Sequence, residues 1–132
     1  MLVVGNAGIL GPLSPLGHVT ADAWNEVLEI NLTANWRLIR TLDPLLRRSE
    51  AGRAIFVTSG AAAAPARLLG PYAVSKAGLE ALVKVYAHEV ENTPVRVNLV
   101  NPGRRARACA PRRSRARIRR PSSRLSTRPA RS

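Results

Sequence analysis

Cysteine, histidine and long apolar runs are scarce in this sequence, and each shortage excludes a class of protein. The single cysteine, Cys109, allows no disulfide within one chain and no thiolate metal site. The two histidines, His18 and His88, are too isolated to indicate a metal centre, so no metal ligand is predicted. No apolar run approaches the ~18 residues of a membrane span, and the N-terminus lacks the basic region and apolar core of a signal peptide. We therefore expect a cytoplasmic protein that does not enter a membrane.

Acidic residues are missing from one end of the chain. Of the formal net charge of +13, residues 1–103 carry only +1, from nine basic and eight acidic residues, whereas residues 104–132 contain twelve arginines and no acid. We predict one near-neutral folded segment over 1–103 and a disordered Arg-rich tail over 104–132, because the tail has too few apolar side chains to offset ordering entropy. Two origins of the tail stay open. One is out-of-frame translation of a GC-rich gene, and the other is an arm that binds nucleic acid non-specifically through its charge.

Three short apolar runs predict strands at residues 2–4, 54–58 and 95–100, and the two intervening segments predict helices at 21–43 and 71–91. The order β-α-β-α-β predicts right-handed crossovers and a parallel α/β sheet. The first run is typical of a buried parallel strand that is covered by helices on both faces. The second helix is predicted to place one apolar face toward the sheet: Leu79, Leu82, Val85, Tyr86 and Val90.

The first predicted helix has an apolar stripe with polar interruptions. Thr20 is a plausible N-cap, with Asp22 in the first turn. Continuing the stripe places Asn31 and Asn35 on the apolar face, where a polar side chain must find hydrogen-bond partners. Both a satisfied core asparagine and a functional one stay open here, and Pro44 is expected to kink or end the helix. The residues that define the stripe are Trp24, Val27, Leu28, Leu38, Ile39 and Leu42.

Tyr72 and Lys76 are spaced as neighbours on one helix face. Pro71 favours a helix start, which places the two side chains at i and i+4. A nearby ammonium and the positive end of a helix dipole favour the phenolate form of a tyrosine, and such a tyrosine is a competent acid or base for a carbonyl/alcohol pair. Ser59, at the end of a predicted strand, can donate a hydrogen bond to the same substrate oxygen. The alternative is a half-buried surface tyrosine beside a solvated lysine.

The combined pattern resembles the short-chain dehydrogenase/reductase family over residues 1–103. The family's Asn-Ser-Tyr-Lys tetrad falls, with its customary spacing, on Asn31, Ser59, Tyr72 and Lys76. Its Asn-Ala-Gly signature fits residues 6–8, and its Pro-Gly turn fits residues 102–103. The resemblance implies a partial Rossmann-type doubly wound parallel sheet. It also implies an oxidoreductase that transfers hydride between NAD or NADP and a small-molecule carbonyl or secondary alcohol.

The resemblance also implies a role for each residue of the tetrad. Tyr72 is the catalytic acid/base, Lys76 assists it and binds the nicotinamide ribose, and Ser59 orients the substrate carbonyl. Asn31 braces a kinked helix and holds a water in the proton relay. The intact family is expected to be homo-oligomeric. Cofactor contacts are implied at Asn6, Ala7, Gly8, Tyr72, Lys76, Pro102 and Gly103.

The sequence departs from the family pattern at both ends. The glycine-rich Thr-Gly-x-x-x-Gly-x-Gly loop, which sets a pyrophosphate on a helix N-terminus, is absent, as is the residue that selects NAD or NADP. After Gly103, where the family supplies a Thr and a substrate-covering helix, Arg104 and Arg105 follow. We therefore expect a central segment of a reductase with impaired activity. The alternatives are a catalytically inactive fragment and a basic protein that binds nucleic acid through the tail.

Overall fold

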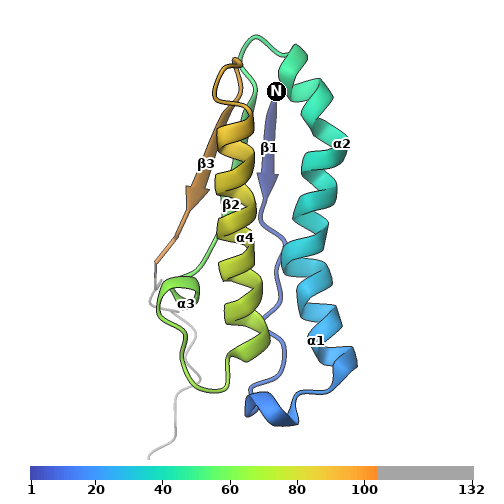
Figure 1. The fold of residues 1–132 in the computed structure, drawn as a ribbon, viewed down its shortest axis with the longest axis vertical. Helices are drawn as coiled ribbons and strands as arrows, with labels where there is room; N and C mark the ends of the chain where they lie inside the picture. Colours follow the sequence, from blue (N-terminus) through green and yellow to red (C-terminus); the bar gives the residue numbers. More distant parts are fainter. Residues whose placement is uncertain (104–132) are drawn as a thin grey trace, which may run out of the picture.

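The computed structural model describes residues 1–103, which form a three-stranded parallel sheet with helices packed against it (Figure 1). Strands β1 (Leu2–Gly5), β2 (Arg53–Val57) and β3 (Arg96–Val100) lie in the order β1-β2-β3 and pair in parallel. The parallel α/β prediction is confirmed, and each strand begins and ends within one residue of its predicted bounds. The predicted tail, with Cys109, lies outside the described residues.

Both long connections place their helices on the same face of the sheet. Each connection steps in the same direction, from β1 to β2 and from β2 to β3, so two right-handed crossovers must lie on one side. Within residues 1–103 the other face has no helix over it, and Leu2 and Val4 there are 62% and 51% exposed. The expectation that the first strand is covered on both faces is therefore not met by this part of the chain. The core between sheet and helices contains Val3, Leu46, Ala54, Phe56, Leu79, Val83, Tyr86, Val90 and Val95.

The first helical segment is interrupted by a π-helical turn. It runs through α1 (Ala21–Leu28), the π turn η2 (Glu29–Thr33) and α2 (Ala34–Arg48). Thr20 is the N-cap, as predicted, and its Oγ1 accepts the Ala23 N–H at 3.2 Å. A π turn inserts an extra residue into the helical register. The predicted stripe is therefore wrong at Leu38, which is exposed, whereas Asn31 and Asn35 are buried.

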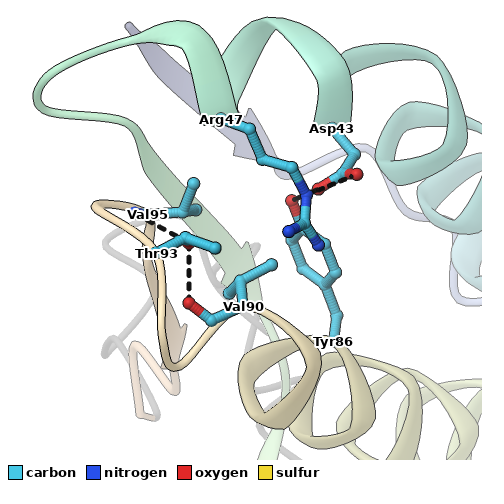
Figure 2. Close-up of polar contacts among 6 residues, drawn as sticks. All are labelled: Asp43, Arg47, Tyr86, Val90, Thr93 and Val95. Carbon is cyan, nitrogen blue, oxygen red and sulfur yellow. Dashed lines mark hydrogen bonds and ion pairs between the residues drawn. The ribbon is translucent and has the colours of Figure 1, made fainter.

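Helix α2 continues past Pro44 to Arg48, so the predicted end at residue 43 is wrong. Proline removes one intrahelical hydrogen bond, but contacts on either side hold the last turn in place. Leu46 is buried in the core. Figure 2 shows Arg47 Nε donating to both carboxylate oxygens of Asp43 at 2.9 Å, while Tyr86 Oη from α4 donates to Asp43 Oδ1 at 2.8 Å. Burial and the bond to Asp43 raise the pKa of Tyr86.

Helix α4 (Gly70–Glu89) has Pro71 in its first turn, as the sequence predicts. The predicted apolar face is wrong at Val85, which is exposed, while Val83 is buried in its place. Two short helices lie outside the two predicted ones, η1 (Leu16–His18) and α3 (Gly60–Ala63). Among the described residues, no helix has the length and apolarity to cross a membrane, and no cluster of three or more potential metal-ligating side chains is present.

Candidate active site

The loops that follow the three strands meet at one end of the sheet. In parallel α/β proteins, ligands bind at the carboxyl ends of the strands, and here a cavity of about 350 Å³ lies at that end. The structure brings Ser59, Tyr72 and Lys76 together on its wall, while the predicted residues Asn31 and Ala7 lie outside the lining. The lining residues are Asn6, Gly8, Ile9, Leu10, Val57, Thr58, Ser59, Tyr72, Lys76, Asn101, Pro102 and Gly103.

Ser59 lies between β2 and α3, and it is held as the N-cap of α3. Its Oγ accepts the Ala61 N–H at 3.3 Å, which leaves the hydroxyl proton free to be donated into the cavity. Ser59 and Tyr72 also line a second cavity of about 410 Å³, whose other walls are largely small and apolar. A substrate oxygen near Ser59 would therefore have an apolar space beside it. The walls of this second cavity, besides Ser59 and Tyr72, are Gly60, Ala61, Ala64, Ala66, Leu69, Asn101 and Gly103.

Tyr72 and Lys76 lie on one face of α4, and Lys76 Nζ is 5.9 Å from the centre of the Tyr72 ring. Lys76 is only 5% exposed, so the alternative of a solvated lysine is wrong. Its Nζ donates a hydrogen bond to the Val57 main-chain oxygen at 3.0 Å. Burial lowers the pKa of the Lys76 ammonium, because a low-dielectric environment disfavours the charged form. The site therefore keeps a partly desolvated cation beside the tyrosine ring.

Asn31 lies behind the cavity and acts on its wall through the loop after β1. The side chain is fully buried: its Oδ1 accepts the Ile9 N–H at 2.8 Å, and its Nδ2 donates to the Ile9 carbonyl at 2.8 Å. Its main-chain oxygen, in the π turn, accepts Asn35 Nδ2 at 2.8 Å. Asn35 is thus a satisfied core asparagine that caps a carbonyl in the π turn, whereas Asn31 fastens the loop that carries Gly8.

Gly8 provides room next to the lysine. A Cβ atom at this position would lie 3.4 Å from both Asn31 Oδ1 and Lys76 Nζ, so a larger side chain would fill the space in front of the ammonium. A cavity with a buried cation and a bare backbone on its rim fits the ribose-nicotinamide half of a dinucleotide. On the opposite rim, Gly103 has a φ of +70° and donates its N–H to Asn101 Oδ1 at 3.0 Å, which shapes the turn containing Pro102.

Sequence reasoning missed three contributors to this site. Ser75 is fully buried and bonded to Asn31, and its position next to Lys76 is the only signal that marked it. Ile9 contributes main-chain atoms, which no side-chain pattern reveals. Thr58 donates through Oγ1 to Glu80 Oε1 at 2.8 Å, tying the end of β2 to α4.

Comparisons with known proteins agree with this geometry. The family model described as short chain dehydrogenase matches residues 1–114. The uncharacterized oxidoreductase YciK of Escherichia coli K12 is 36% identical over 101 residues, which are 76% of this chain and 40% of YciK. The L-fucose dehydrogenase of Oryctolagus cuniculus is 40% identical over 102 residues, covering 76% of this chain and 35% of that protein.

A solved structure gives the same likeness in three dimensions. A short chain dehydrogenase from Shigella flexneri 2a, complexed with NADP, superposes with a TM-score of 0.73 at 36% identity, covering 77% of this chain and 42% of that one. The chain spans about two fifths of the length of the curated relatives that it matches.

Proposed function

This chain belongs to the short-chain dehydrogenase family of oxidoreductases, and we propose that residues 1–103 form its catalytic segment. The proposed reaction is hydride transfer between a nicotinamide cofactor, NAD or NADP, and a small-molecule carbonyl or secondary alcohol. One observation carries the proposal: Ser59, Tyr72 and Lys76 line a single cavity at the carboxyl ends of the strands.

Each side chain has a distinct part in the proposed reaction. In the reducing direction, the Tyr72 hydroxyl gives its proton to the substrate oxygen, and in the oxidising direction the phenolate takes it back. Ser59 donates a hydrogen bond to that oxygen and orients it toward Tyr72. The Lys76 ammonium stabilises the phenolate electrostatically, more strongly than a solvated lysine could, because it is buried.

The cofactor supplies or accepts the hydride when it is bound. We propose that Lys76 and Tyr72 contact its nicotinamide ribose, and that Asn6, Ala7 and Gly8 form one side of its site. Pro102 and Gly103 would form the other side. The Shigella flexneri relative is complexed with NADP, which supports a nicotinamide cofactor for this chain. The chain contains no glycine-rich phosphate loop, so no residue is assigned to the pyrophosphate and none to the choice between NAD and NADP.

The remaining parts of the proposal rest on the sequence. We propose a cytoplasmic enzyme with one folded segment over 1–103, a separate tail over 104–132, and a homo-oligomeric assembly. The absence of the phosphate loop favours a second candidate, a catalytically inactive segment. Cofactor titration separates the two, because only the first requires dinucleotide binding. A third candidate, nucleic-acid binding through the tail, predicts a DNA affinity that falls steeply as the salt concentration rises.

The test of the proposed function is a Tyr72→Phe substitution in the full chain. We expect carbonyl reduction to fall by ~10²–10⁴-fold, the usual contribution of a general acid–base group. The affinity for NADPH and NADH, measured by fluorescence titration, should stay largely intact, because the proposed Lys76 contact to the ribose remains. The matched control is Tyr86→Phe, because Tyr86 bonds Asp43 on α2 and does not line the cavity. A Tyr72→Phe protein as active as the Tyr86→Phe protein would exclude the assignment, and a wild-type chain that binds neither cofactor would favour the inactive segment.

A further inference from the structure

The Asn31 side chain and its two hydrogen bonds to the Ile9 main chain are here called the Asn31 clamp. A buried hydroxyl links this clamp to the helix that carries Tyr72. Ser75 is fully buried in α4. Its Oγ donates to the Tyr72 main-chain oxygen at 2.7 Å and accepts a hydrogen bond from Asn31 Nδ2 at 3.0 Å. The hydroxyl therefore joins the π turn to the first turns of α4, and Asn31 joins the π turn to the loop after β1.

Both N–H hydrogens of the Asn31 side-chain amide are used in hydrogen bonds. An asparagine amide has two N–H hydrogens, and here one goes to the Ile9 carbonyl and the other to Ser75 Oγ. The carbonyl oxygen of the same amide accepts the Ile9 N–H. The Asn31 side chain is thus held at both ends, with the strand loop on one side and α4 on the other, and Ser75 is the group that makes the second link.

We propose that Ser75 is a positioning residue that sets the place of Tyr72 relative to the loop carrying Gly8. The part of this inference that concerns catalysis rests on the proposed function. The hydroxyl does not line either cavity around Tyr72, so it acts through Asn31 and through the Tyr72 backbone. Alanine at this position would leave one Asn31 N–H without a partner in a site that water does not reach. A buried donor without a partner is unfavourable, so the amide would turn and loosen its bonds to Ile9.

The chain contains a control with the same hydrogen-bond pattern just beyond the other end of α4. Thr93 Oγ1 donates to the main-chain oxygen of Val90, three residues earlier, at 2.7 Å (Figure 2). It also accepts one N–H, that of Val95, at 3.2 Å. Ser75 makes the same pair of bonds, one to an i−3 carbonyl and one from an N–H, but Thr93 does not touch the site. A Thr93→Val substitution therefore removes a hydroxyl with the same two kinds of bond, from a half-buried residue, without touching the Asn31 clamp.

The experiment compares S75A, S75T and T93V in the full chain by NMR. For S75A we expect displaced Asn31 side-chain amide resonances. We also expect hydrogen exchange at the Ile9 amide to be faster by about tenfold, the equivalent of one lost hydrogen bond. For T93V the same change should appear at Val95 and not at Ile9. S75T keeps a hydroxyl that can donate to the i−3 carbonyl, so Ile9 exchange should return toward the wild-type rate.

Activity gives the second measurement. We expect S75A to lower kcat by about tenfold or more while the cofactor Kd stays within about twofold, because misplacing a catalytic group slows the chemical step. T93V should leave both unchanged. Circular dichroism establishes that each variant is folded. If S75A does not fold, S75C, which is close in size and a weaker hydrogen-bond partner, serves for the same comparison.

The results separate this inference from the proposed function. The inference is overturned if the Asn31 side-chain resonances and the Ile9 exchange rate of S75A equal those of wild type. It is also overturned if the wild-type chain is active and S75A has the same kcat. A wild-type chain without hydride transfer overturns the proposed function, and the NMR comparison then decides the positioning role on its own. Displaced Asn31 and Ile9 signals that S75T restores and T93V does not reproduce support it.

Discussion

Replacing Asn31 with alanine tests whether the clamp behind the cavity stabilises the fold. The substitution removes three hydrogen bonds, two to the Ile9 main chain and one to Ser75. Each such bond contributes about 1 kcal/mol to stability on average, and the partners left behind are in a site where Asn31 is fully buried. We therefore expect N31A to lower the free energy of unfolding by about 3 kcal/mol. That is a large part of the ~5–15 kcal/mol typical of a folded domain.

Urea unfolding of the full chain, followed by far-UV circular dichroism, measures this loss. With a denaturant dependence of about 1–3 kcal/mol per molar, the midpoint should fall by about 1–3 M. Asn25→Ala is the matched control, because Asn25 is an exposed asparagine in α1. Both substitutions replace a helical asparagine with alanine, so the difference between their free energies of unfolding reports mainly on the buried hydrogen bonds of Asn31. If N31A and N25A unfold within about 0.5 kcal/mol of each other, the reasoning is refuted.

Three further substitutions test other parts of the structure. Gly5→Ala should destabilise the chain by about 1–3 kcal/mol, because a Cβ there would collide with Asn35 Oδ1 and the Phe56 ring; an unchanged urea midpoint would contradict that packing. Lys76→Met should abolish hydride transfer and raise the urea midpoint at neutral pH, since burial lowers the pKa of Lys76 and makes its charge unfavourable in the folded state; a lower midpoint would count against this. The raised pKa of Tyr86 means that the folded state retains the phenol proton when the unfolded chain loses it. Stability should therefore fall as the pH rises above ~10, and Tyr86→Phe should flatten that fall in urea midpoints measured from pH 9 to 12.

Local patterns in the sequence predicted most of the fold. The three apolar runs, the Thr20 cap and the helix start at Pro71 each depend on neighbouring residues, and all agree with the structure. The end of the first helix could not be predicted in this way. The rule for Pro44 concerns one lost hydrogen bond, whereas the burial of Leu46 and the bond from Tyr86 to Asp43 depend on segments far away in the chain.

The spacing in the sequence indicated which residues form the proposed tetrad, but not the contacts that hold these residues in place. Spacing placed Tyr72 and Lys76 on one helix face, and the structure agrees. The spacing did not reveal that Asn31 binds the main chain of Ile9, because main-chain N–H and C=O groups can come from any type of residue. The burial of Lys76 beneath the end of β2 was equally hidden, since it results from the packing of α4 on the sheet.

The π turn between α1 and α2 has a consequence for where this sequence can tolerate a deletion. A π turn accommodates one extra residue within a helix, so deleting one residue from Glu29–Thr33 would restore an ordinary α turn and leave the helix after it in register. Leu46 would stay in the core and Asp43 would stay beside Tyr86, while the side chains of the turn itself would be displaced. Within α2 nothing absorbs a deletion: each residue of an α-helix turns the chain by about 100°, so the residues on the two sides of the deletion would no longer face the same way. We therefore expect a one-residue deletion in the π turn to destabilise the chain less than a one-residue deletion in the middle of α2, which urea unfolding of the two variants can check.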